Sequence, residues 1–411
     1  MANHFDAVII GGGVAGLLCA GFAARRGMRV AVLEKNGRPA RKVRITGKGR
    51  CNVTNNCDNN DFIRAVRGNG RFLYSAIAAF STADTMAFFE GLGVPLKTER
   101  GNRVFPVSDQ ATDIVDALVG FAKDGGAKIF TGQAAKEVLA ENGQVTGVLL
   151  ESGEVIPCTR AVIATGGKSY PLTGSTGDGY RMAQQLGHTI APIKPSLIPI
   201  VAKEGYCAAM MGLSLRNVTL KVLDSGKKKP VFEELGEMLF THFGVSGPLV
   251  LSASSHMTGD LSRYRMEIDL KPGLTAQQLD ARLLRDFEEN RNRDFANSLD
   301  ALLPRKMIPV VVELSGIPAG EKVHQITREQ RQGLCILIKA FPVTPKAFRP
   351  IEEAIVTSGG IKVGEINPKT MESKLVEGLF FAGEVIDVDG YTGGYNLQIA
   401  FSTGYLAAQN L

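Results

Sequence analysis

The stretch FDAVIIGGGVAGLLCAGFAARRGMRVAVLEK, residues 5–35, decides the fold class of this chain. Phe5 to Ile10 is a short apolar run, which is typical of a strand buried on both faces. Val14 to Arg26 reads as a helix, because it ends at a glycine, where helices commonly stop. A second apolar run, Arg29 to Leu33, predicts another buried strand. The order strand, helix, strand predicts a Rossmann-like βαβ unit.

Three glycines between the first strand and the helix form the pattern GxGxxG. The first permits a tight turn, the second lets the backbone approach a pyrophosphate, and the third lets helix and strand pack closely. Glu34, at the tip of the second strand, is placed to accept hydrogen bonds from ribose hydroxyls. The stretch therefore predicts a dinucleotide site, with contacts from Gly11, Gly13, Val14, Ala15, Gly16, Glu34 and Lys35.

Length and composition limit the number of domains and the kinds of partner that this protein can have. A chain of 411 residues predicts two or three domains, and a net charge of +6 is weak evidence for a polyanionic partner. Six cysteines without CxxC or zinc-like spacing predict no metal site and favour the cytoplasm. The uncharged run from Ala7 to Ala24 is long enough for a membrane span, but its glycine pattern favours the nucleotide site, so no membrane contact is expected.

Three later segments favour FAD over NAD as the dinucleotide. RAVIATGG (160–167) predicts a strand followed by two glycines, and GSTGDGYRMAQQLGH (174–188) predicts a glycine turn that opens a helix. The segment 378–409 predicts a strand, an acidic glycine loop and a final helix. Glycine loops from distant parts of the chain suit a large, embedded cofactor, whereas an NAD site is usually completed within one contiguous domain. A second GxGxxG with its own strand and acid is absent from the sequence.

Five further motifs extend over most of the chain: GRCNVTN (49–55), TGGKSYPLTGSTGDGY (165–180), FTHFGVSGP (240–248), TSGGI (357–361) and FAGEVIDVDGYTGGYNLQIAFSTG (381–404). With these motifs the sequence resembles the bacterial YhiN-like (BaiN/RdsA) family of NAD(P)/FAD-dependent flavoprotein oxidoreductases. The resemblance implies an FAD domain that is split in sequence and completed by the C-terminal segment. The activities it implies are diverse: reduction of a ring C=C in steroid enones, reduction of a uracil ring in ribosomal RNA, and oxidation of a small aminoketone. Lys48 departs from the pattern, because glycine is expected there.

The segment GRPARKVRITGKGR (37–50) carries six cations and could be a nucleic-acid patch, a solvated loop or a cradle for an internal anion. It begins three residues after Glu34 and lines the FAD in the family it resembles, so the cradle is the preferred interpretation. Arg38, Arg41 and Arg44 are expected in solvent or in ion pairs. The predicted contacts are Lys42, Gly47, Gly49, Arg50, Cys51 and Asn52, with Cys51 as an inert thiol rather than an acid or a redox partner of Cys57.

The remaining cofactor contacts are predicted in the glycine loops. Backbone near Ala135 is expected at the adenine, and Asp387 at the ribityl hydroxyls. The glycine turn at 394–397 should place N–H groups and a helix N-terminus near the flavin pyrimidine. The predicted contacts are Ala135, Ala164, Thr165, Gly166, Gly167, Gly383, Glu384, Asp387, Gly394, Tyr395, Asn396 and Leu397.

The predicted fold class is α/β, with a Rossmann-like FAD-binding domain formed by residues 1–190 and 346–411. Short alternating strands predict a β-rich substrate domain at 191–272, and charged amphipathic helices predict a helical cap at 273–345.

Reduction of a C=C by a flavin needs a proton donor opposite the hydride. His242 and Tyr391 are candidates for this donor, and Lys168 is a candidate for stabilising an enolate or the reduced flavin; His242 is one of five histidines and lies in a family motif. Each candidate also has a non-catalytic interpretation: His242 could position a loop, Lys168 could be solvated, and Tyr391 could pack on the flavin as an aromatic ring.

The predicted function is FAD-dependent reduction of an activated C=C, with NAD(P)H as a transient hydride donor. Oxidation of an amine or aminoketone by oxygen is the first alternative, and formation of dihydrouridine in RNA is the second. A small-molecule substrate is preferred over RNA, because the segment LRDFEENRNRD (284–294) mixes both charges, although DSGKKKP (224–230) carries three lysines in a row.

Overall fold

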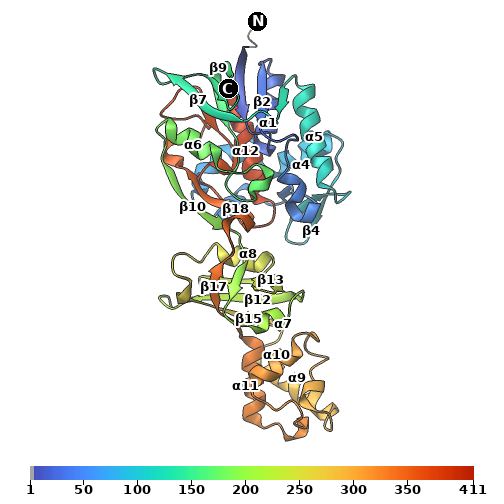
Figure 1. Cartoon of the computed structure of the whole chain (residues 1–411). Helices are drawn as coiled ribbons and strands as arrows, with labels where there is room; N and C mark the ends of the chain where they lie inside the picture. Colours follow the sequence, from blue (N-terminus) through green and yellow to red (C-terminus); the bar gives the residue numbers. More distant parts are fainter. Residues whose placement is uncertain (1–3) are drawn as a thin grey trace. The chain divides into compact units, whose positions relative to one another are not determined.

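The computed structural model describes residues 4–411. It divides into two compact units, residues 1–196 with 351–411, and residues 197–350 (Figure 1). The α/β class with a split Rossmann-like domain and an inserted β-rich and helical part is confirmed. The predicted roles of substrate domain and helical cap, and the boundary between them at 272/273, stay predictions.

A seven-stranded sheet forms the centre of the first unit. Five strands are parallel, in the order β6, β2, β1, β9, β19, and β8 and β7 extend β9 as an antiparallel meander (Figure 1). β1, β2 and β19 are almost wholly apolar because they are buried on both faces, whereas the edge strand β6 is partly exposed. The strands are β1 (Phe5–Ile10), β2 (Val30–Glu34), β6 (Lys128–Thr131), β7 (Ala135–Glu141), β8 (Gln144–Leu150), β9 (Val155–Ile163) and β19 (Leu379–Phe381).

Helix α1 (Val14–Arg25) packs against α12 (Tyr395–Asn410) and α5 (Ala111–Asp124) (Figure 1). A Cβ on Gly404 of α12 would lie 2.5 Å from the carbonyl oxygen of Ala15, so only glycine allows this approach of the two helices. The C-terminal helix thus completes the core that the first βαβ unit begins.

Two smaller sheets and four further α-helices complete the first unit. β3 (Thr54–Asn55), β5 (Arg103–Pro106) and β4 (Leu96–Glu99) form one sheet, and β10 (Ile190–Ser196) pairs with β18 (Val356–Ile361) in the other. The helices are α2 (Asn59–Arg64), α3 (Tyr74–Ala79), α4 (Thr82–Gly91) and α6 (Asp178–Gln185).

The run Gly70–Gly91 is long and apolar enough to cross a membrane by length and composition alone. Its backbone, however, is extended at Phe80 (φ −149°) and at Ser81 (ψ 177°). The Ser81 side chain caps α4 in a capping box with Asp84, so a new helix starts there. The run is therefore two short helices with a break between them, and Phe80 is buried in the core.

The second unit contains a seven-stranded antiparallel sheet in the order β16, β15, β12, β13, β14, β11, β17. One apolar cluster includes residues from this sheet and from its helices. The strands are β11 (Ile200–Ala202), β12 (Ser214–Asp224), β13 (Phe232–Thr241), β14 (Gly244–Ser246), β15 (Tyr264–Asp269), β16 (Phe341–Val343) and β17 (Pro345–Phe348). The α-helices are α7 (Tyr206–Ala209), α8 (Pro248–Ser254), α9 (Ala276–Glu289), α10 (Ile308–Ser315) and α11 (Arg328–Lys339).

The two ends of the second unit lie side by side. Ile200 of β11 pairs with Phe348 of β17, and the Arg349 N–H donates to the Pro199 carbonyl at 3.1 Å. The insertion therefore leaves the first unit and returns to it through neighbouring strands.

Candidate cofactor site

The glycine turn between β1 and α1 contains one open position and two crowded ones. A Cβ on Gly11 (φ +109°) would lie 2.5 Å from the Ala164 carbonyl oxygen, and one on Gly16 would lie 2.0 Å from the Gly11 carbonyl oxygen. A Cβ on Gly13 would meet no atom within 4 Å, and no side chain caps the helix that begins after it. Open space at an uncapped helix N-terminus fits the pyrophosphate of a dinucleotide.

The loops after three parallel strands meet at this turn. The Gly11 N–H donates to the Leu33 carbonyl at 2.9 Å, and the Ala164 N–H donates to the Ile10 carbonyl at 2.9 Å. After β19, a Cβ on Gly383 would lie 3.1 Å from Ala15 Cβ. The structure thus brings together, at the carboxyl ends of the strands, the predicted contacts of the first turn, of 164–167 and of 383–384, which is where open α/β sheets bind ligands.

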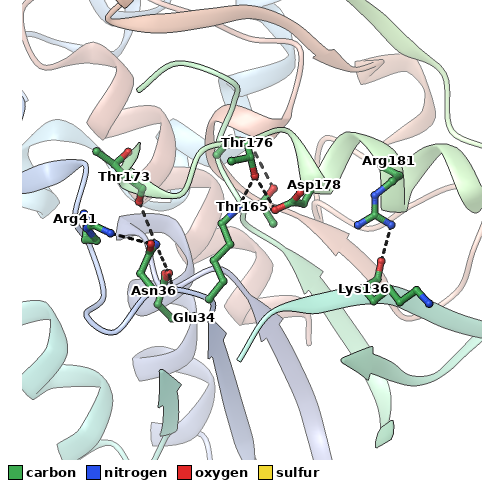
Figure 2. A network of polar contacts seen from close by, with 11 residues as sticks. Glu34, Asn36, Arg41, Lys136, Thr165, Thr173, Thr176, Asp178 and Arg181 are labelled. Carbon is green, nitrogen blue, oxygen red and sulfur yellow. Dashed lines mark hydrogen bonds and ion pairs between the residues drawn. The ribbon is translucent and has the colours of Figure 1, made fainter. Parts of the chain in front are cut away.

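Glu34 is buried at the end of β2, where its carboxylate accepts three N–H groups. Figure 2 shows its pairing with Asn36. Its Oε2 accepts from Gly12 N–H at 3.0 Å, and its Oε1 accepts from the backbone and side-chain N–H groups of Asn36 at 2.8 and 2.7 Å. Asn36 Nδ2 also donates to the Thr173 carbonyl at 3.2 Å, and Asn36 Oδ1 accepts from Arg41 at 3.0 Å. Glu34 therefore joins the glycine turn to the loop at 173; its contact with a ribose stays a prediction.

The Lys35 side chain binds residues of this chain at the start of α6. Its ammonium lies 2.6 Å from the Asp178 carboxylate and donates to the Thr176 hydroxyl. Burial opposes ionisation of Asp178, but the hydrogen bonds from Lys35 and Thr176 outweigh it and lower the pKa of Asp178. Lys35 thus joins the end of β2 to the start of α6.

Most cations of the basic segment 37–50 have partners within the chain. The Arg50 guanidinium lies over the Phe105 ring at 4.1 Å and pairs with Glu99 and with Asp109 at 2.6 Å. Arg44 lies 3.5 Å from Asp116. A nucleic-acid patch is disfavoured by this pairing, and only the backbone of Arg50 remains available for its predicted contact.

The backbone of this segment explains the departure at Lys48. Gly47, Lys48 and Gly49 have φ values of +57°, +61° and +86°. All three lie in the left-handed region, where glycine is least strained, and that is why glycine is expected at position 48. Lysine adopts this strained backbone conformation at position 48, with its side chain exposed.

Lys42 and Glu384 form a partly buried ion pair between four segments. The Lys42 ammonium lies 2.7 Å from Glu384 Oε2 and donates to the Ser169 hydroxyl at 2.7 Å. Glu384 Oε1 accepts from the Thr357 N–H at 2.8 Å, and the Thr357 hydroxyl accepts from the Lys168 N–H at 2.8 Å. A Cβ on Gly167 would lie 2.4 Å from that hydroxyl, so glycine is required for this packing.

Cys51 and Asn52 follow the basic segment, and Asn52 lies at the N-terminus of α12. Cys51 is fully buried, and burial raises the pKa of its thiol to about 12, so the thiol is neutral and unreactive at pH 7. With its Nδ2 facing the carbonyls of Thr54 and Val104, Asn52 accepts from the Gly394 N–H at 3.0 Å. The predicted N–H group of Gly394 thus already has a partner within the chain.

The acidic loop before α12 is held mainly by amides. Asn396 Oδ1 accepts from the Gly390 N–H at 2.8 Å, and its Nδ2 donates to the Gly390 carbonyl. Burial raises the pKa of Asp387, against the hydrogen bond that Asn69 donates to it at 3.0 Å. Tyr395 packs on Phe62, with ring centroids 5.6 Å apart. Ala135, at the start of β7, is buried, and Leu397 is half-buried; their cofactor contacts stay predictions.

The three catalytic candidates lie in different units. His242 is exposed at the turn between β13 and β14 in the second unit, and its ring packs on Phe243. Lys168 and Tyr391 belong to the first unit, where Lys168 is exposed and Tyr391 lies 5.8 Å from the Arg67 guanidinium. Among residues 4–411, no three His, Cys, Asp or Glu side chains are grouped so that they could hold a metal ion.

Tyr180 is a candidate that the sequence patterns did not single out. It is 7% exposed, and its hydroxyl has no hydrogen-bond partner among the described residues. Its position directly after TGDG in a family motif was the available signal.

Comparisons with known proteins agree with this geometry. The family model of the HI0933-like protein Rossmann domain matches residues 5–410. The 3-dehydro-bile acid delta(4,6)-reductase of Clostridium scindens is 31% identical over 98% of this chain and 97% of its own length. The ribosomal RNA dihydrouridine synthase of Escherichia coli is 32% identical over 100% of this chain and 98% of its own length. The solved 3-ketosteroid-delta4-(5alpha)-dehydrogenase of Rhodococcus jostii RHA1 has a similar fold, with a TM-score of 0.52 at 14% identity over 100% of this chain and 96% of that one.

Proposed function

The chain belongs to the HI0933-like family of Rossmann-domain proteins, which are FAD-dependent oxidoreductases, and from this premise we propose that it reduces a C=C conjugated to a carbonyl group. NAD(P)H serves as the transient hydride donor. The predicted resemblance to the YhiN-like (BaiN/RdsA) flavoproteins is confirmed by the same comparisons.

The observation that carries the proposal is the chemistry shared by two relatives of equal similarity. A bile acid delta(4,6)-reductase and a dihydrouridine synthase act on very different molecules, yet each name describes saturation of a C=C next to a carbonyl. Both relatives match this chain along almost its whole length, so the similarity includes the segments that form the candidate cofactor site.

The residues of this chain bind and orient the cofactor in the proposal. When bound, FAD supplies the hydride chemistry. The open position at Gly13 and the N-terminus of α1 receive the pyrophosphate, and Glu34 accepts hydrogen bonds from the ribose. The Lys42–Glu384 pair holds the surrounding loops in register.

Anaerobic titration tests the reductase. The purified protein is expected to be yellow and to release FAD on heating. NADH or NADPH should bleach the flavin without added substrate, and a steroid enone should then restore the colour in the absence of oxygen. Protein that cannot be reconstituted with FAD would refute the proposal at its first step.

The alternative function is oxidation of an aminoketone by oxygen, and the same titration distinguishes it from the reductase. In that case nicotinamides leave the flavin oxidised, whereas an aminoketone bleaches it and air restores the colour with formation of peroxide. Slow consumption of NAD(P)H in air does not discriminate, because reduced flavins also pass electrons to oxygen.

A further inference from the structure

A hollow of about 410 Å³ lies in the first unit, beside helix α6. Its volume is within the range of small-molecule sites, roughly 300–1,000 Å³. One wall is apolar and comes from strand β10, with Ile190, Pro192 and Ile193. Arg181 and Gln184 line the hollow from one face of α6, three positions apart. An apolar wall beside polar side chains suits a ligand with a flat apolar body and a charged end.

Two cations line this hollow, and its lining includes no acidic residue. Lys168 and Arg181 are exposed, and their side chains form no ion pair with any of residues 4–411. The Arg181 guanidinium donates to the Lys136 carbonyl at 2.9 Å (Figure 2). The acidic residue of α6, Asp178, pairs instead with Lys35 at 2.6 Å. The lining of the hollow therefore carries positive charge without a counter-charge of its own.

The hollow adjoins the loops of the candidate cofactor site. Lys168 directly follows the glycine loop 164–167, which is predicted to contact the cofactor. The Lys168 N–H donates to the Thr357 hydroxyl at 2.8 Å, and the Thr357 N–H donates to Glu384 at 2.8 Å. The lining does not include Gly13, where the pyrophosphate of FAD is proposed to lie. A second ligand can therefore bind beside the cofactor loops without competing for the glycine turn.

The charges of the lining distinguish the two nicotinamide dinucleotides. Sites that take NAD place an acidic residue at the ribose 2′-hydroxyl, whereas sites that take NADP place an arginine at the 2′-phosphate. We propose that this hollow binds the adenosine 2′-phosphate end of NADPH. Lys168 and Arg181 contact the phosphate, and the wall formed by β10 contacts the adenine. The inference rests on the proposed function, which needs a nicotinamide donor, and it deepens that function by naming NADPH as the donor.

Binding of NADP⁺ and NAD⁺ to the FAD-loaded, oxidised protein tests the site without turnover. The two probes differ only in the 2′-phosphate, and calorimetry measures each Kd at low salt. The wild type should bind NADP⁺ more tightly than NAD⁺. Lys168→Met and Arg181→Met should each weaken binding of NADP⁺ about fivefold, because an exposed cation adds a modest attraction that salt screens. Both variants should keep the wild-type Kd for NAD⁺.

Two exposed cations outside the hollow supply the matched controls. Lys369→Met and Arg328→Met remove the same kinds of charge and should leave both Kd values unchanged. Equal losses in these controls would show that only the net charge of the protein matters, which would overturn the site. Arg181→Met also removes a hydrogen bond to β7, so thermal unfolding is measured for each variant. If Arg181→Met unfolds early, Lys168→Met decides the test, because the Lys168 side chain makes no such bond.

Four other results would overturn the site. The first is absence of measurable NADP⁺ binding, and the second is equal affinity of the wild type for NADP⁺ and NAD⁺. The third is a loss of the same size for both probes, which would place the two cations on the pyrophosphate that both probes contain. The fourth is a lower FAD content in Lys168→Met, which would place that lysine on the phosphates of the cofactor itself.

Flavin reduction separates failure of this site from failure of the proposed function. If NADPH bleaches the flavin with the same KM in the wild type and in both variants, the reductase stands and the hollow is not its NADPH site. If NADP⁺ binding responds to the variants as expected while NADPH leaves the flavin oxidised, the site stands and the reductase does not.

Discussion

Gly13 is the residue at which the missing side chain leaves space for the pyrophosphate of the cofactor. A Cβ there meets nothing within 4 Å, so alanine adds no clash to the protein itself. Gly13→Ala should therefore fold normally and yet lose FAD affinity at least tenfold, or about 1.4 kcal/mol, because the added methyl competes with the pyrophosphate. Equilibrium dialysis of the apoprotein with FAD measures the loss.

Gly120→Ala is the matched control for that variant. Gly120 lies in α5, and a Cβ on it also meets nothing within 4 Å. This change should keep full FAD affinity and slightly raise stability, since alanine favours helix. Equal affinity in Gly13→Ala and Gly120→Ala would mean that the open position holds no ligand.

For single residues, the sequence predicted packing between neighbours in the chain better than it predicted ion pairs between residues far apart in the chain. The crowding at Gly16 arises within one βαβ unit, so the pattern GxGxxG was enough to predict it, whereas Gly11 is crowded by the carbonyl of Ala164 from a distant strand. The partners of Lys35 and Arg50 lie 143 and 49 positions away, in Asp178 and Glu99. A single sequence contains no signal for such pairs, and both cations were expected at the cofactor instead.

At the scale of elements, the Lys42–Glu384 pair joins the basic segment to the loop before α12. Glu384→Gln leaves a partly buried ammonium without its counter-charge, so the free energy of unfolding should fall by about 1–3 kcal/mol. Urea unfolding of Lys42→Met, Glu384→Gln and the double variant measures the coupling. Additive losses would show that the two side chains do not depend on each other.

Strand β10 is preceded by a buried histidine that should make stability depend on pH. His188 Nε2 lies 2.9 Å from the Ser373 hydroxyl, Nδ1 lies 3.3 Å from Glu365 Oε2, and the ring packs on Phe381. Burial lowers the pKa of His188 below 6.5, against the opposing charge of Glu365. The unfolded chain therefore binds a proton that the folded chain resists as the pH falls below 6.5.

Stability should consequently be complete above pH 6.5 and decrease as the pH falls through the lowered pKa, by about 1.4 kcal/mol for each pKa unit of lowering. His188→Gln should flatten this slope between pH 7.5 and 5.5. Chemical unfolding at several pH values measures it; an unchanged slope in the variant would exclude His188. The pKa of Glu365 is also lowered, but its protonation affects stability only below pH 4.5, the ordinary pKa of a glutamate.

At the scale of the whole molecule, the insertion should fold by itself. Residues 197–350 contain their own apolar cluster, and β11 pairs with β17 where the segment begins and ends. The excised segment should show one cooperative urea transition and the sheet signal in circular dichroism. A gradual, non-cooperative change would mean that the insertion needs the first unit to fold.

The RNA alternative is also tested on the insertion. Lys227, Lys228 and Lys229 are exposed in the connection between the antiparallel strands β12 and β13. If RNA is the substrate, changing all three to Glu should weaken RNA binding and flatten its salt dependence while FAD content stays the same. Normal turnover of an enone by this variant is our expectation; loss of dihydrouridine from cellular RNA would contradict it.

The packing of α12 on α1 constrains the order in which the protein can mature on the ribosome. The strand β19 and the helix α12 complete a sheet and a helix pair whose other members are made more than two hundred residues earlier. The insertion, by contrast, has both of its edge strands once residue 348 has left the exit tunnel. Domains usually fold in the order of synthesis. The insertion, residues 197–350, can therefore fold before the first unit does. The N-terminal part of the first unit keeps its apolar strands exposed until β19 and α12 have been synthesised, so we expect chaperones to bind that part during translation.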